Sequence, residues 1–160
     1  MKVVYHCFGG THTSVLTAAI HLGWLPARRI PSPDEIAHIP YFDDTPTESI
    51  GSPILMGQDE QGHQVYVLGL RGMDPILVPS IVDLLRVLNS YDQIYMVDTL
   101  RPLPFSGRAG GFISRRVGLV ALGRPLILTA VRKAYPSFVR IALQTKEGLS
   151  GGWARGQVQP

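Results

Sequence analysis

The first 23 residues, MKVVYHCFGGTHTSVLTAAIHLG, restrict the fold more than any other part of the chain. Residues 2–7 are β-branched and aromatic, which predicts a buried strand. A polar loop with two adjacent glycines follows, and residues 15–22 then carry apolar side chains at helical spacing before a C-capping glycine. A strand, a glycine loop and a helix in this order present free backbone N–H groups at the helix N-terminus, where anions bind. We therefore expect a ligand site at this loop, with Thr13 or Ser14 as the helix N-cap.

Length and composition predict one globular domain. The chain has 160 residues, of which 45% are hydrophobic and 17% charged, and this is enough apolar material for a single core. One cysteine excludes an internal disulfide framework, and there is no signal peptide or membrane-spanning run, so we expect a cytoplasmic protein. We place the domain at 1–149 and a flexible C-terminal tail at 150–160.

A proline-rich excursion at 24–51 interrupts the domain pattern. Five prolines punctuate it, and Ser32-Pro33 is a good helix start, which predicts a short helix over 33–38. Connections of this length in compact domains are often functional lids. We therefore expect this excursion to form a flap.

The rest of the chain alternates between strand and helix patterns. Two strands around a polar turn predict a β-hairpin at 52–57 and 64–70. A helix at 74–89, a strand at 93–97, a helix at 111–122 closed by Gly123, a strand at 125–129 and a last helix with Pro136 in its first turn are expected to follow. The inward face of the helix at 74–89 is expected to hold Ile81, Leu84, Leu85 and Leu88.

This order predicts an α/β fold. We expect a three-layer sandwich with a mostly parallel sheet, P-loop-like or Rossmann-like, including one β-hairpin. Ligands in such folds bind at the carboxyl ends of the strands. The candidate ligand-binding residues at this edge are Gly9, Gly10, Thr11, His12, Thr13, Ser14, Asp98, Arg101 and Arg108.

The pattern supports a phosphate cradle without matching a P-loop. A P-loop reads GxxxxGK[ST], and here no lysine precedes Thr13 or Ser14. His12 occupies that place, where it could contact a phosphate or act as a general base. Asp98 follows four apolar residues, as the Walker B aspartate does, which leaves Mg²⁺ with a nucleotide as a cofactor to consider. The alternative interpretation is a loop that only turns the chain.

Cys7 carries a second interpretation. A cysteine at the end of a strand, before a glycine loop and a helix, resembles the loop of low-molecular-weight tyrosine phosphatases and of sugar phosphotransferase carriers. The phosphatase loop needs a closing arginine, and Thr13-Ser14 stand there instead. Cys7 and His12 are thus the candidate catalytic residues of a phosphoryl carrier or hydrolase, and a buried, inert cysteine is the alternative.

No metal site is predicted. His6 and Cys7 are adjacent on a strand and point to opposite faces, so they cannot readily share an ion. His21 and His38 are expected to be packing or surface residues, and His63 a turn residue.

Charge is divided unevenly along the chain. Before Arg101 there are five Lys/Arg against eleven Asp/Glu, and from Arg101 onward ten Lys/Arg against one acid. The arginines are interspersed, without an aromatic-interleaved basic patch, which argues against nucleic acid as a partner and favours a phosphorylated small molecule or nucleotide. The sequence leaves homo-oligomerisation open.

Three segments, YHCFGGTHTS…AAIHLG, PILMGQDEQGHQVYVLGL and GRPLI…RKAYP, resemble a small bacterial family catalogued as domain of unknown function 3189. The resemblance implies a single-domain cytoplasmic protein and supplies no activity or catalytic residues. Three functions therefore stay open: binding of a phosphorylated ligand at the loop, Cys7-dependent phosphoryl chemistry, and a non-catalytic regulatory or interaction protein that keeps a relic loop.

Overall fold

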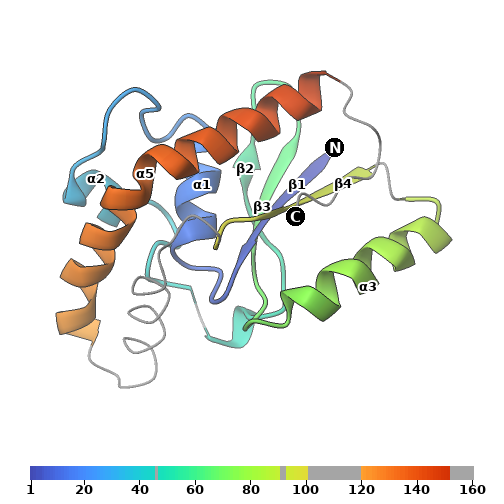
Figure 1. Cartoon of the computed structure of the whole chain (residues 1–160), viewed down its shortest axis with the longest axis horizontal. Helices are drawn as coiled ribbons and strands as arrows, with labels where there is room; N and C mark the ends of the chain where they lie inside the picture. The colour runs from blue at the N-terminus through green and yellow to red at the C-terminus, as the bar shows by residue number, and fades with distance from the viewer. Residues whose placement is uncertain (46, 91–92, 101–119, 152–160) are drawn as a thin grey trace.

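The computed structural model describes residues 1–45, 47–90, 93–100 and 120–151. Its centre is a four-stranded sheet in the order β2-β3-β1-β4, formed by β1 (Lys2–Cys7), β2 (Ile54–Gln58), β3 (Gln64–Gly69) and β4 (Ile94–Asp98). β1 is parallel to both β3 and β4, and β2 is antiparallel to β3. The predicted α/β class, the mostly parallel sheet and the hairpin are therefore confirmed (Figure 1).

Helices lie on both faces of the sheet because its central strands are apolar on both sides. Val3 and Tyr5 of β1 pack with α1 (Thr13–His21) and α5 (Val120–Ser150), while Val4 packs with α3 (Asp74–Val87). The strand alternation sends successive side chains to opposite faces. This arrangement places α1, which follows the glycine loop, against the centre of the sheet (Figure 1).

The excursion contains the expected short helix, α2 (Pro33–Ala37). Ser32 accepts a hydrogen bond from the backbone of Glu35, and the Glu35 carboxylate accepts one from the backbone of Ser32, which forms a capping box. A single 3-10 turn, η1 (Thr47–Ser49), precedes the hairpin.

The C-terminal elements were predicted wrongly. The strand expected at 125–129 and the cap expected at Gly123 lie inside α5, and Pro136 lies in its interior rather than in a first turn. A short apolar run does not distinguish a strand from a buried helix. Buried side chains instead continue along α5 at helical spacing, and the packing of this buried stripe on α1 outweighs the effect of the prolines. The buried residues are Ile127, Val131, Ala134, Tyr135, Phe138, Ala142 and Thr145.

One local prediction fails and another holds only in part. The N-cap of α1 is His12, with no side-chain capping bond, rather than Thr13 or Ser14. On the inward face of α3, Ile81 packs on the sheet as expected, but the fully buried residues are Val78 and Val82. Leu84 and Leu88 are instead 58% and 60% exposed.

The glycine loop crosses the end of β3 at backbone contact distance. Gly10 has a φ of +69°, and a Cβ there would lie 2.7 Å from the Gly69 nitrogen. A Cβ on Gly69 would in turn lie 2.8 Å from the carbonyl carbon and oxygen of Gly9. Only glycine fits on both sides of this contact, which fixes where the loop leaves the sheet.

Substitution by alanine separates the contributions of conformation and contact. Gly23→Ala should lose about 1–2 kcal/mol of unfolding free energy, because its φ of +75° is left-handed but nothing lies within 4 Å of a Cβ. Gly69→Ala tests the contact alone and should lose about 2 kcal/mol, and Gly10→Ala combines both effects and should lose about 3 kcal/mol or more. Urea denaturation measures all three; a Gly10→Ala loss no larger than that of Gly23→Ala would contradict the steric account.

Candidate functional site

The loop after β1 and the start of α1 form a buried polar cluster at the carboxyl edge of the parallel strands. The Thr13 hydroxyl lies 3.0 Å from that of Thr99, which follows β4 and donates to the His6 carbonyl at 2.8 Å. Gly10, Thr11 and Ser14 of the same loop are buried. The structure thus joins the loops after β1 and β4, as the sequence predicts, and adds Thr99.

Cys7 ends β1 inside this cluster. Its Sγ accepts a hydrogen bond from the Gly10 amide at 3.1 Å and lies 3.2 Å from the Ser14 hydroxyl. The side chain is 4% exposed. The glycine turn therefore wraps around the sulfur, which faces the interior of the loop rather than solvent.

A part of the excursion covers the loop. The Thr11 hydroxyl donates to the Tyr41 carbonyl at 3.3 Å, the Thr45 hydroxyl donates to it at 3.0 Å, and the Asp43 amide donates to the Thr11 carbonyl at 3.2 Å. His12 Nε2 lies 3.0 Å from Asp43 Oδ1, and both side chains are about 15% exposed. Tyr41 and Asp43 hold left-handed φ values of 67° and 58°, so this segment, 41–45, adopts a costly backbone to make these contacts.

The other predicted residues are placed only in part. Asp98 ends β4 in register with His6, and its Oδ1 accepts the Leu100 amide at 2.8 Å. The residues Arg101 and Arg108 lie outside the described part of the chain. His6 and Cys7 do point to opposite faces, because Cys7 contacts the α1 loop while His6 follows Val4 on the α3 face.

His6 is buried at this edge, and its Nδ1 has no hydrogen-bond partner among the described residues. Burial lowers the pKa of His6, and the nearby carboxylates of Asp98 and Asp74 act in the opposite direction. The sequence offered no signal for this histidine beyond its place at the strand end.

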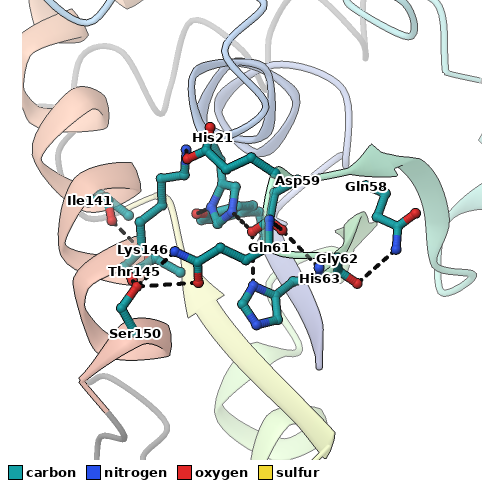
Figure 2. Close-up of polar contacts among 12 residues, drawn as sticks. His21, Gln58, Asp59, Gln61, Gly62, His63, Ile141, Thr145, Lys146 and Ser150 are labelled. Carbon is teal, nitrogen blue, oxygen red and sulfur yellow. Dashed lines mark hydrogen bonds and ion pairs between the residues drawn. The ribbon is translucent and has the colours of Figure 1, made fainter.

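A second polar cluster lies at the other end of α1 and was not predicted (Figure 2). Asp59, in the hairpin turn, accepts hydrogen bonds at 3.0 Å from His21 Nε2 and from His63 Nδ1 through the same oxygen, Oδ2. Its other oxygen accepts the amides of Gln61 and His63. Tyr5 lies 2.7 Å from His21 Nδ1, so the chain of contacts reaches the central strand.

The protonation states of this cluster follow from its contacts. Burial alone raises the pKa of Asp59, but the bonds from His21, His63 and the turn amides outweigh it and hold that pKa well below its usual range. Burial lowers the pKa of His21 and raises that of Tyr5. An ionised Asp59 only accepts, so neutral His21 donates through Nε2 and accepts the Tyr5 O–H at Nδ1.

The same turn holds the end of α5. The Lys146 ammonium donates to the Glu60 carboxylate at 2.8 Å. The side-chain amide of Gln61 donates to the Ser150 hydroxyl at 3.0 Å (Figure 2). His21 and His63, expected as a packing residue and a turn residue, thus connect α1, the hairpin and β1 through one carboxylate. The signal in the sequence for this cluster was the pair Asp59 and His63, which lie four residues apart in a turn.

Among the described residues no three His, Cys, Asp or Glu side chains gather closely enough to hold a metal ion. Within the same residues no helix is long and apolar enough to cross a membrane.

These features define an α/β protein with a buried glycine loop at the carboxyl edge of its central strand. The chain belongs to the family described as Protein of unknown function (DUF3189), which matches residues 2–147. The resemblance found in the three sequence segments is thereby confirmed. No curated protein and no solved structure matches the chain.

The His21 cluster predicts a loss of stability on mild acidification. The folded pKa of His21 lies below the unfolded value of about 6.5, so the unfolded state binds more protons below that pH. The stability that neutral His21 provides is complete above about pH 6.5 and decreases as pH falls toward the folded pKa, by up to about 1.4 kcal/mol per pH unit. His6, whose pKa is also lowered, adds to the same slope.

Thermal or urea unfolding between pH 7.5 and 5 measures this slope. His21→Asn should reduce it, and His38→Asn, at an exposed position, should leave it unchanged. Equal slopes in the wild type and in His21→Asn would show that His21 does not control it.

Proposed function

We propose that this protein binds a phosphorylated small molecule or nucleotide at the Gly9–Ser14 loop. The observation that carries the proposal is the start of α1. This helix begins at the carboxyl edge of the central strand with no side-chain capping bond and no acidic residue in its first turn. The amides of a first helical turn have no partners within the helix, and they attract anions.

The surroundings of the loop support the same ligand class. Because Gly10 and Gly69 carry no side chains, backbone atoms line this edge of the sheet. The hydroxyl groups of Thr13 and Thr99 meet there. Asp98 ends β4 at this edge, on the same face of the sheet as His6, and would be the residue to hold Mg²⁺ if the ligand is a nucleotide. The β1–loop–α1 unit is the basis for proposing a P-loop-like or Rossmann-like site.

The 41–45 segment gives the proposed site a cover. Asp43 places a carboxylate oxygen on His12 Nε2, the position where a phosphate oxygen would bind in our proposal. An incoming anion would therefore displace this carboxylate, and the segment would move with it. Binding and movement of the cover are then coupled, because each contact of Asp43 with the loop is lost when the ligand enters.

Removal of the Asp43 charge tests this proposal. We expect inorganic phosphate, ADP or Mg–ATP at millimolar concentration to raise the melting temperature, since a ligand at 100 times its Kd adds about 2.7 kcal/mol of stability. Asp43→Asn should tighten binding about tenfold, because one repelling charge near the anion is removed, and His12→Gln should weaken it. The control is Asp34→Asn, at an exposed position on α2.

The measurement is a thermal-shift titration at constant ionic strength. If none of these ligands stabilises the wild type or Asp43→Asn, the proposal is wrong, and a regulatory or interaction protein with a relic loop becomes the better interpretation.

The contacts of Cys7 support the second candidate, a Cys7-dependent phosphoryl carrier or hydrolase. The Gly10 amide donates to Sγ at 3.1 Å, so the sulfur lies inside the turn that would hold a phosphoryl group. Iodoacetamide should label Cys7 in the native protein at neutral pH if the thiol is reactive, and Asp43→Asn should accelerate labelling if segment 41–45 covers it. Labelling only after denaturation would exclude this candidate.

A further inference from the structure

The outer face of α3 carries large apolar side chains in contact with solvent. Met73, Ile76, Leu84 and Val87 are between 50% and 78% exposed, although the helix buries Val78 and Val82 on the sheet. Figure 1 shows α3 at the edge of the molecule, apart from α1 and α5. Large exposed apolar patches are typical of interaction sites.

The spacing of these residues is symmetric. Counted from Ser80, the stripe lies at −7, −4, +4 and +7, which are Met73, Ile76, Leu84 and Val87. At 100° per residue all four lie within about 40° of Ser80 around the helix, opposite the buried Val78 and Val82. A stripe with this order reads the same in both directions along the helix.

A symmetric stripe is self-complementary in an antiparallel pair. When a two-fold axis passes beside Ser80, Ile76 of one helix meets Leu84 of the other, and Met73 meets Val87. Serine is small, so the two helices can approach closely at the axis, as ridges-into-grooves packing requires. The apolar residues then cover one another in both copies.

The helix dipole favours the antiparallel orientation over the parallel one. Antiparallel pairing brings the N-terminal end of one helix level with the C-terminal end of the other, whereas parallel pairing would bring like ends of the two dipoles together. Asp74 and Arg86 lie about 120° from Ser80 around the helix, and Arg86 pairs with Asp83 of the same helix at 2.7 Å. The orientation therefore follows from the helix dipoles and from the symmetry of the apolar stripe.

We propose that α3 is the interface of a two-fold dimer, and that the occupant of its apolar face is the antiparallel α3 of a second copy of this chain. The residues of the Gly9–Ser14 loop are not part of the apolar stripe, and α1, which follows the loop, packs on the face of the sheet opposite α3. The proposal is thus independent of the ligand proposed above.

Light scattering after size exclusion measures the assembly. The wild type should have twice the monomer mass of 17.5 kDa, and Ile76→Glu should raise the dimer dissociation constant about 100-fold or more, because it buries an unpaired carboxylate. The control, Leu143→Glu, alters an exposed leucine of α5 and should leave the dimer intact. Circular dichroism of each variant distinguishes dissociation from unfolding.

Cross-linking tests the position of the axis. Ser80→Cys should form a disulfide between two copies under mild oxidation, since its two copies face each other across the axis. Arg86→Cys should not, because six residues of rise place each copy about 9 Å from the axis along the helix. A monomeric wild type, or cross-linking of Arg86→Cys equal to that of Ser80→Cys, would overturn the proposal.

Discussion

The approach of Gly9-Gly10 to Gly69 is the contact on which the edge of this protein depends. Because the two backbones touch, the loop after β1 must turn over the end of β3 instead of leaving the sheet. That turn aims the Gly10 amide at the Cys7 sulfur and starts α1 directly above the central strand. The position of α1 in turn determines where α5 packs. The contact of Gly9-Gly10 with Gly69 therefore sets the geometry of the face of the sheet that α1 and α5 cover.

Helix α1 is held by different chemistry at its two ends. All nine of its residues are buried, which leaves little contact with water to satisfy polar groups. At its C-terminal end His21 is matched to Asp59 and Tyr5 by hydrogen bonds that leave no choice of tautomer. At its N-terminal end α1 has no side-chain cap, and His12 Nε2 lies 3.0 Å from Asp43 Oδ1. The C-terminal end is therefore fixed by side-chain hydrogen bonds to the hairpin turn and β1, and the N-terminal end by the contacts of the glycine loop with segment 41–45.

The first 98 residues were largely predictable because local signals and tertiary packing agree there. The strand–loop–helix start, the helix that begins after Ser32, the turn at Asp59 and the strand that ends at Asp98 all occur as expected. Beyond residue 119 the signals conflict: prolines and a short apolar run favour separate elements, while one buried stripe from Ile127 to Thr145 favours a single helix. That the loops after β1 and β4 meet at one edge was predictable from the two parallel strands that end at Cys7 and Asp98. The pairs His12–Asp43 and His21–Asp59 were not, since they join positions 31 and 38 residues apart that no local pattern connects.

The sheet order has a consequence for how the chain assembles. β1 precedes the other described strands in the chain, yet it lies between β3 and β4, whose pairing residues follow it by some 60 and 90 positions. The central strand therefore stays unpaired until most of the polypeptide exists, and its apolar side chains are exposed during that interval. Closure of such long loops is slow, and unpaired strands of this kind are prone to aggregate. A sheet with this strand in its interior depends on synthesis of the later strands, and protection of residues 2–7 during that interval becomes a condition for obtaining the native protein.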